Sequence, residues 1–246
     1  MYVERYGSGL AAVLGLHGWS GDHRTFEPLV PYLPPMVTLY APDLPGCGQS
    51  PPPGEWTLAG VLAPLADLAR KLPAPLTLLG NCSGAILALC LALRLPESSL
   101  ARLVLIDPFA YWPWYFRVFA SRAIGAYAYW LSFGNPIGRR LLNLALAAKR
   151  NRQTDLTAGF RFASQRTALA YLRMLEEIRD LSEFARLRVP VQILHGERTF
   201  GAVRASLRSF QALWPAATVQ EIAGAGHLPL KEAPQAVAAS IFAELR

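Results

Sequence analysis

The fold of this chain is decided by the stretch Leu76-Thr77-Leu78-Leu79-Gly80-Asn81-Cys82-Ser83-Gly84. An apolar run typical of a buried strand ends at Leu79, and an apolar run typical of a buried helix follows from Ala85. Gly80 and Gly84 let the backbone bend sharply between the two elements, so the side chain midway between them is raised at the start of the helix. The sequence therefore predicts a strand, a tight turn and a helix, with Cys82 presented as a nucleophile.

Composition indicates one large α/β domain. The chain has 246 residues, 52% of them hydrophobic, with a mean hydropathy of +0.24, which is enough apolar material for a substantial core. Its cysteines are three in number, which fits a reducing compartment better than a disulfide framework. Because no apolar run reaches the roughly 18 residues of a spanning helix and the N-terminus lacks a signal-peptide layout, we expect a cytoplasmic protein.

The formal charge of +7 raises the question of an anionic partner. The arginines are dispersed except around Lys149-Arg150-Asn151-Arg152, so no nucleic acid is expected and a soluble basic surface is the simplest interpretation. An anionic membrane surface and an anionic acyl carrier such as coenzyme A or a phosphopantetheine thioester remain alternatives. No spacing of cysteine and histidine suggests a metal site, and no cofactor is predicted.

Short β-rich runs alternate with helical ones, which is the pattern of a mostly parallel sheet covered on both faces. The predicted strands are Ala12–Leu16, Val37–Tyr40, Leu76–Leu79, Leu103–Ile106, Val191–Leu194 and Thr218–Ile222. The predicted helices are Thr25–Leu33, Leu58–Leu72, Ala85–Leu95, Val203–Leu213 and Pro234–Leu245.

Residues 108–188 break this alternation. They contain no convincing strand, so we predict a helical cap inserted into a core made of residues 1–107 and 189–246, above the sheet edge where open α/β folds bind ligands. Aromatic residues open this insertion, and we interpret four of them as a wall of an acyl pocket: Phe109, Trp112, Trp114 and Tyr115. Two alternatives stay open. The rings could simply pack the cap on the core, or the cap could make peripheral membrane contact, because Ala123–Leu131 is apolar and flanked by arginines.

Four motifs in order along the chain resemble those of the α/β-hydrolase superfamily. They are Leu16-His17-Gly18-Trp19, the loop Asp43-Leu44-Pro45-Gly46-Cys47-Gly48-Gln49-Ser50, the elbow at Cys82, and Gly224-Ala225-Gly226-His227-Leu228-Pro229. The loop after Asp43 is similar to that of members bearing a cap. The resemblance implies a mostly parallel, twisted sheet flanked by helices, with a helical cap inserted after the strand that ends near Asp107.

Acyl transfer needs a nucleophile, a base and donors for the oxyanion. Cys82 is the expected nucleophile because it, and not Ser83, lies midway between the two glycines; Ser83 would contribute its backbone N–H. The resemblance implies Trp19 as the second N–H donor and His227 as the base. His17 is expected to be structural.

The third member of a triad is the point where the sequence departs from the family. After the strand Val191–Leu194, relatives commonly carry an aspartate at the position that Thr199 occupies here. Three alternatives remain for the group that orients His227. Thr199 could do so without charge, Glu197 could reach in, or Asp107 at the end of the preceding strand could supply the acid, although an Asp-Pro pair is also a common turn former.

A cysteine could tolerate the loss of that acid. A thiol ionises readily at a helix N-terminus and beside a histidine, so a thiolate and an imidazolium can pair before substrate arrives. A thiolate nucleophile also expels another thiolate more easily than an alkoxide. We therefore predict a thioesterase or acyltransferase acting on an apolar acyl thioester, carried on coenzyme A or an acyl carrier protein, through an acyl-Cys82 intermediate. The alternatives are a hydrolase of activated esters or lactones, and a non-catalytic binding protein that keeps the pocket.

Overall fold

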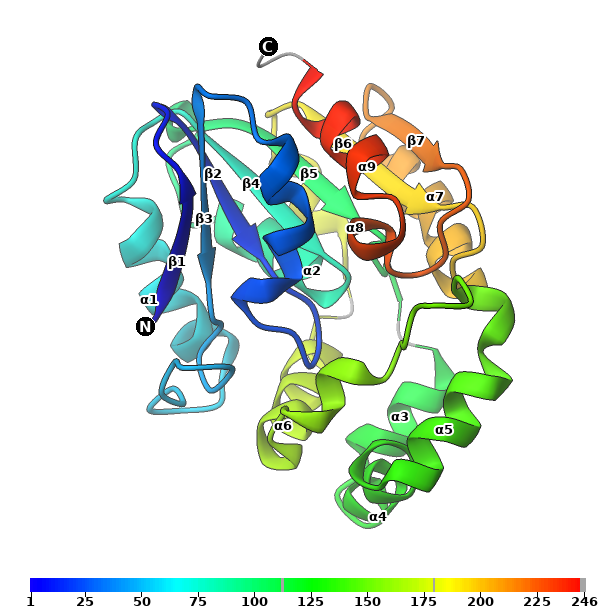
Figure 1. Cartoon of the computed structure of the whole chain (residues 1–246). Helices are drawn as coiled ribbons and strands as arrows, with labels where there is room; N and C mark the ends of the chain where they lie inside the picture. Colours follow the sequence, from blue (N-terminus) through cyan, green and yellow to red (C-terminus); the bar gives the residue numbers. More distant parts are fainter. Residues whose placement is uncertain (112, 179, 244–246) are drawn as a thin grey trace.

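Seven strands pair into one sheet in the order β1-β3-β2-β4-β5-β6-β7 (Figure 1). The structure is a computed structural model that describes residues 1–111, 113–178 and 180–243. The strands are β1 (Val3–Gly7), β2 (Ala11–Leu16), β3 (Val37–Pro42), β4 (Leu76–Asn81), β5 (Leu100–Ile106), β6 (Val191–Gly196) and β7 (Thr218–Ile222). Only β1 is antiparallel to its neighbour, β3, so the prediction of a mostly parallel sheet is confirmed.

One strand, β1, was not predicted from the sequence. This strand lies at the edge of the sheet and carries polar residues, so it is at most partly buried and lacks the apolar run that identified the central strands. The six predicted strands all form, several of them one to three residues longer than expected.

Helices cover both faces of the sheet. One face packs against α1 (Leu58–Ala69), α2 (Ser83–Ala92) and α7 (Gly201–Leu213), and the other against η1 (His23–Tyr32), α8 (Pro229–Glu232) and α9 (Pro234–Ile241). Where we predicted an α-helix over Thr25–Leu33, the chain forms the 3₁₀ helix η1 instead. Pro28 and Pro31 lie inside it and offer no N–H, which disfavours regular α-helical hydrogen bonding.

Residues 108–188, called the inserted segment below, connect β5 to β6. Their longer elements are α3 (Trp114–Ala120), α4 (Gly125–Tyr129), the π-helix η3 (Trp130–Gly134), α5 (Pro136–Ala145) and α6 (Gln165–Glu176). No strand occurs among its described residues. Figure 1 shows these helices beyond the carboxyl ends of the parallel strands.

Trp19 joins the inserted segment to the sheet. Its indole Nε1–H donates to the carbonyl of Ala168 in α6 at 2.9 Å. Its ring lies edge-on to those of Phe133 and Phe160, with centroid distances of 5.3 and 4.8 Å. Because such contacts add to the burial of large rings, this cluster fixes the inserted segment above the loop that follows β2.

In the part of the chain that the structure describes, no helix is both long and apolar enough to cross a lipid bilayer.

Candidate active site

Cys82 lies on a sharp turn between β4 and α2. Its backbone has φ of 54° and ψ of −120°, a left-handed conformation that is costly for a residue with a side chain. The turn is held because the Cys82 N–H donates to the carbonyl of Ile106 in β5 at 2.8 Å. It is also crowded, since a Cβ on Gly84 would lie 2.2 Å from the carbonyl oxygen of Leu16. The predicted elbow is therefore present, with Cys82 at the first turn of α2.

Three side chains from three loops meet at this turn. Sγ of Cys82 lies 3.6 Å from Nε2 of His227, and Nδ1 of His227 lies 2.8 Å from Oδ2 of Asp107. Cys82 follows β4, Asp107 follows β5 and His227 lies in the loop after β7. A thiol, an imidazole and a carboxylate are thus connected in the order that nucleophilic acyl transfer requires.

Asp107 is fully buried and accepts hydrogen bonds at both carboxylate oxygens. Oδ1 accepts from the N–H of Gly196 at 3.0 Å, and Oδ2 accepts from the hydroxyl of Thr199 at 2.6 Å as well as from His227. Its backbone is also left-handed, with φ of 48°. Both oxygens of this buried carboxylate therefore have hydrogen-bond donors.

Of the three residues considered as partners of His227, Asp107 is the one whose carboxylate contacts the ring, at 2.8 Å. Thr199 contacts His227 Nδ1 only at 3.3 Å, and its hydroxyl is directed to Asp107. The carboxylate of Glu197 instead accepts from the N–H of Gly224 at 2.6 Å. The sequence suggested that Cys82 compensates for the loss of an acid beside His227. That premise is wrong, because the carboxylate of Asp107 contacts His227. The reading of the chain as a non-catalytic binding protein loses its main support for the same reason.

The contacts of His227 raise its pKa to about 10. Burial, the largest single effect, favours the neutral ring, but hydrogen bonds to Asp107 and Cys82 and the charges of both partners outweigh it. The raised pKa favours the protonated ring, whose Nδ1 faces the Asp107 carboxylate and whose Nε2 faces Sγ of Cys82.

Aromatic rings enclose the histidine. Ring centroids of Phe200 and Phe109 lie 4.5 and 5.8 Å from that of His227. Phe200, at the start of α7, had no role in the sequence analysis because a single phenylalanine in a loop carries no motif. The two rings therefore cover part of the imidazole of His227.

The four aromatic residues predicted to line an acyl pocket differ in position. Phe109 lies beside His227, and Tyr115 is half-buried, with its ring centroid 5.0 Å from that of Phe116. Burial, followed by the charges of Tyr111 and Cys82, raises the pKa of Tyr115. Trp114 is 76% exposed, so its assignment to a pocket wall is wrong: it occupies an outward position of α3. Trp112 lies outside the described residues.

The inserted segment also holds the histidine loop. The N–H of His227 donates to the carbonyl of Lys149 at 2.9 Å, and Nζ of Lys149 donates to the carbonyl of Thr199 at 3.1 Å. A Cβ on Gly226 would lie 2.1 Å from the same Lys149 oxygen, so only glycine allows this approach. One residue of the inserted segment therefore contacts both the loop of the base and the loop beside the acid.

The predicted oxyanion donors lie on the other side of Cys82. Ser83 is the first residue of α2, where backbone N–H groups have no partner within the helix. The loop that carries Trp19 is adjacent, because a Cβ on Gly18 would lie 2.9 Å from Cβ of Cys82. Ser83 and the loop that carries Trp19 are thus both next to Cys82.

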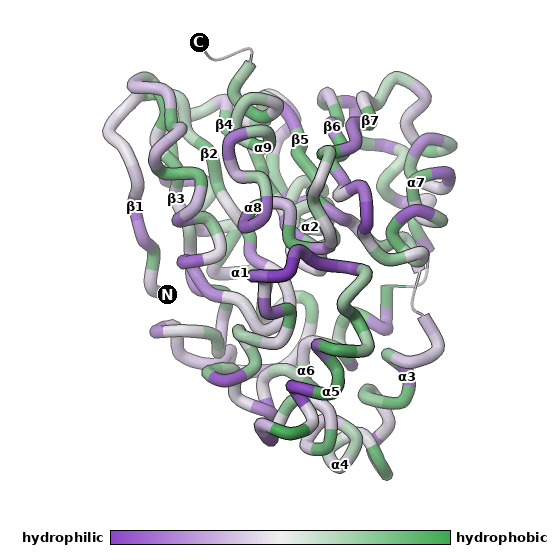
Figure 2. The backbone as a smooth tube through the Cα atoms, turned by 45° about the vertical axis from the view of Figure 1, so that its right-hand side comes forward, coloured by the Kyte–Doolittle hydropathy of each residue, from purple (hydrophilic) through white to green (hydrophobic). Residues whose placement is uncertain are grey.

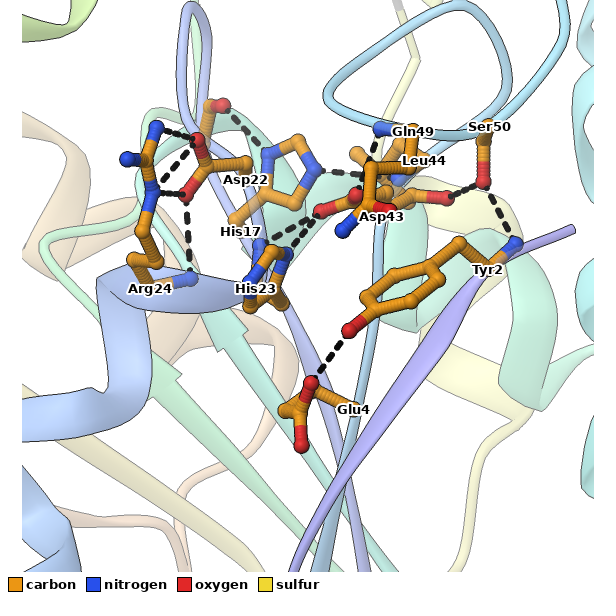
Figure 3. Close-up of polar contacts among 11 residues, drawn as sticks. Tyr2, Glu4, His17, Asp22, His23, Arg24, Asp43, Leu44, Gln49 and Ser50 are labelled. Carbon is orange, nitrogen blue, oxygen red and sulfur yellow. Dashed lines mark hydrogen bonds and ion pairs between the residues drawn. The ribbon is translucent and has the colours of Figure 1, made fainter.

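His17 positions the Trp19 loop, as the sequence analysis expected. Its Nδ1–H donates to the carbonyl of Gly18 at 2.9 Å, and its Nε2 accepts from the N–H of Leu44 at 3.0 Å (Figure 3). Burial lowers the pKa of His17, so the ring is neutral, as one donated and one accepted bond require.

A buried carboxylate organises the neighbouring loop. Asp43 accepts from the N–H and ring Nδ1 of His23 and from the N–H of Gln49, all within 2.8 Å (Figure 3). Asp22, His23 and Asp43 lie close enough together for their side chains to bind one metal ion. The carboxylate of Asp22, however, is paired with Arg24 through several hydrogen bonds. The contacts make this cluster a support for the loop after Asp43.

A cavity of about 520 Å³ opens beside the oxyanion donors. It lies between the loops after β2 and β3 and residues 159–171 of the inserted segment. Trp19, Ser83, Leu44, Phe162 and Tyr171 contribute to its walls. The space is large enough for an acyl chain or for part of a carrier group.

Comparison with known proteins gives a consistent family. The model of the family described as "Alpha/beta hydrolase family" matches residues 13–240. The chain is 39% identical over 110 residues to lipase LipV of Mycobacterium tuberculosis, a match that spans 44% of this chain and only 41% of the lipase. It is 29% identical over 246 residues to the pimeloyl-[acyl-carrier protein] methyl ester esterase of Aeromonas hydrophila, spanning 95% of this chain and 94% of that protein.

Solved structures agree on the fold. An esterase from Thermogutta terrifontis superposes with a TM-score of 0.77 at 23% identity, covering 100% of this chain and 92% of that one. At this identity the likeness concerns the architecture of the sheet and helices only.

Proposed function

Since this chain belongs to the alpha/beta hydrolase family, we propose that it is a cysteine-dependent acyl hydrolase or acyltransferase acting on apolar acyl thioesters. The observation that carries the proposal is the contact of Cys82 Sγ with His227 Nε2 at 3.6 Å, backed by the 2.8 Å contact of His227 with Asp107. This geometry supports a thiolate nucleophile paired with an imidazolium.

The proposed reaction has two halves. The Cys82 thiolate attacks the carbonyl carbon, a C–S bond forms, and the resulting oxyanion accepts from the N–H groups of Ser83 and Trp19. Collapse of the adduct breaks the bond to the leaving group, which takes the Nε2 proton of His227. Neutral His227 then removes a proton from water or from an acceptor, which attacks the acyl-Cys82 carbonyl and releases the thiolate.

Leaving-group chemistry favours a thioester. The tetrahedral adduct expels the weaker base, and an alkoxide competes poorly with the thiolate of Cys82, whereas another thiolate competes on nearly equal terms. The acyl-carrier substrate named for the Aeromonas relative supports a substrate held on a carrier arm, either an acyl carrier protein or coenzyme A.

Hydrolysis of carboxylic esters is the second candidate, and Asp107 is the observation that favours it. A buried carboxylate on Nδ1 keeps the imidazole oriented and charged, which is the acid assistance that an alkoxide leaving group needs. The relatives described above as a lipase and a methyl ester esterase agree with this candidate.

The test is acylation followed by intact-mass measurement. The protein is incubated with acyl thioesters and with alkyl esters of the same acyl groups, alongside Cys82→Ala and the control Ser83→Ala, which retains its N–H. We expect an acyl adduct and turnover with thioesters in the wild type and in Ser83→Ala, and neither in Cys82→Ala. An adduct that survives in Cys82→Ala and disappears in Ser83→Ala would assign the nucleophile to Ser83. Absence of adduct and turnover with all thioesters, esters and lactones would favour a binding protein.

The Cys82→Ser variant separates the two candidates. Serine keeps the geometry but replaces the thiolate with an alkoxide, so the ratio of thioester to ester turnover should fall on substitution. An unchanged or higher ratio would favour ester hydrolysis as the native reaction.

A further inference from the structure

Helix α5 is amphipathic with its apolar side turned outward. Ile137, Leu141 and Leu144 recur at the spacing of one helix face, and they are 73%, 62% and 62% exposed. Two polar side chains of the same helix point inward, since Arg139 donates to the carbonyl of Phe133 and Asn143 donates to Asp155, whereas Arg140 is exposed. The helix therefore leaves a stripe of three large apolar side chains in water, and such a stripe marks an interaction surface.

A second exposed stripe precedes it. Ile124, Tyr127 and Leu131 follow one another along α4 and η3 at three- and four-residue spacing and are all exposed, whereas Tyr129 and Phe133 on the opposite side are buried against Trp19. The side-chain amide of Asn135, which precedes α5, donates to the carbonyl of Leu131 at 3.1 Å, so the two stripes belong to elements in contact. We call these six residues (Ile124, Tyr127, Leu131, Ile137, Leu141 and Leu144) the outer apolar face.

The outer apolar face lies at the end of the molecule away from the sheet. In Figure 1, α4 and α5 form the tip farthest from β1 and from both termini, and Figure 2 shows hydrophobic stretches among polar ones along the same helices. Nothing else in the described chain covers these side chains, since each is exposed.

The positive charge around the outer apolar face favours an anionic partner. Between Asp107 and Asp155 the sequence has no aspartate or glutamate and seven basic residues: Arg117, Arg122, Arg139, Arg140, Lys149, Arg150 and Arg152. Arg122 and Arg140 are exposed next to the two apolar stripes. A second copy of this chain would bring the same positive charge and be repelled, whereas an anionic surface would be attracted.

We propose that the outer apolar face docks on the surface of an anionic lipid bilayer, with Ile137, Leu141 and Leu144 entering the interface. Exposed aromatic and aliphatic side chains combined with arginines are the composition of helices that lie in the plane of a membrane. In this arrangement the helices that carry the outer apolar face lie parallel to the bilayer surface and do not span it. This contact requires no change in the site around Cys82 and does not depend on the proposed reaction.

The test is co-sedimentation of the full chain with vesicles of phosphatidylcholine alone and of phosphatidylcholine mixed with phosphatidylglycerol. We expect binding to the anionic vesicles, weakened by salt, and little binding to the neutral ones. Each of Arg122→Gln and Arg140→Gln should weaken partitioning about fivefold. The double variant Leu141→Glu/Leu144→Glu should weaken it by on the order of tenfold or more.

Matched controls separate this surface from the rest of the molecule. Leu10→Glu changes a leucine that is 87% exposed between β1 and β2 and should bind vesicles like the wild type. Cys82→Ala should also bind normally, so a failure of the proposed chemistry would not affect the result. Thermal unfolding verifies that each variant is folded.

Three outcomes would overturn the proposal. The first is no partitioning into either vesicle. The second is equal partitioning of the wild type and Leu141→Glu/Leu144→Glu. The third is a dimer in solution, or a complex with an acidic protein, that these two substitutions abolish while vesicle binding is absent.

Discussion

The hydroxyl of Thr199 donates a 2.6 Å hydrogen bond to Asp107. The oxygen that accepts it, Oδ2, is also the one that accepts from His227. The residue at the position where relatives commonly carry an acid therefore supports an acid that comes from another strand. The proposed site contains a charged partner for its histidine without an aspartate at position 199.

Removing the hydroxyl of Thr199 should lower the activity of the enzyme. In Thr199→Val, Oδ2 of Asp107 loses one donor in a buried position, so kcat/KM should fall about tenfold, the equivalent of about 1 to 2 kcal/mol. Thr199→Ser retains the donor and is the matched control. Steady-state kinetics with an acyl thioester measure both, and wild-type values for Thr199→Val would show that the bond does not matter.

Placing an aspartate at position 199 should impair the enzyme. Thr199→Asp would bring a second carboxyl group into hydrogen-bond distance of Asp107, and two adjacent carboxylates in a buried site cannot both ionise readily. We expect lower kcat and a distorted pH profile. Higher activity in this variant would instead mean that position 199 is the better place for the acid.

Asp107→Asn should shift the alkaline limit of activity. The pKa of His227 is raised to about 10, so the imidazolium that protonates the leaving group persists until pH rises through that value. Without the carboxylate the limit should move toward the ordinary pKa of about 6.5, and kcat should fall by about two to four orders of magnitude. Profiles of kcat/KM against pH for both proteins test this, and an unmoved limit would exclude Asp107 as the cause.

The same pKa shift affects stability. Because the folded-state pKa of His227 lies above its unfolded value, its contribution to stability is fully present below about pH 6.5 and is lost as pH rises through about 10. The free energy of unfolding of the wild type should therefore decline over this range more than that of His227→Gln. Parallel declines in denaturant titrations would contradict the assignment.

The indole of Trp19 should contribute to stability more than to chemistry. Trp19→Phe removes the Nε1–H bond to Ala168 but keeps the backbone N–H and an aromatic ring, so the free energy of unfolding should fall by about 1 kcal/mol with a small change in kcat. Denaturant titration and kinetics on the same sample separate the two effects. A large loss of kcat at unchanged stability would assign the side chain a direct role.

The turn at Cys82 should not tolerate a side chain at its end. Gly84→Ala would place a methyl 2.2 Å from the carbonyl oxygen of Leu16, so we expect a loss of about 3 kcal/mol or more in the free energy of unfolding. Gly54→Ala is the control, because no atom lies within 4 Å of the position its Cβ would take. Equal stability of the two variants would contradict the described packing.

Most of the sheet could be predicted because its strands are buried on both faces and read as continuous apolar runs such as Leu76–Leu79. β1 could not, since an edge strand with one wet face has no such run. The elbow at Cys82 and the loop of His227 were identified because their glycines and order form motifs.

The partner of the histidine could be named from the sequence only as one of three alternatives. Asp107 and Thr199 are 92 residues apart, and their contact depends on the adjacency of β5 and β6, which the sequence does not express. Phe200 was missed for a similar reason, because its contact with His227 arises from the path of a loop. The outward position of Trp114 reflects which side of α3 faces the core, and seven residues are too few to show a period.

The bond from the His227 N–H to the carbonyl of Lys149 ties the amide of the proposed base to the inserted segment. An amide held in this way can exchange its hydrogen with solvent only when the bond opens. Hydrogen exchange at the His227 amide should therefore report local unfolding of residues near Lys149. Detachment of this stretch would release the loop of His227 while the sheet stays folded. The exchange rate of this one amide thus reports whether the inserted segment stays in contact with the histidine loop.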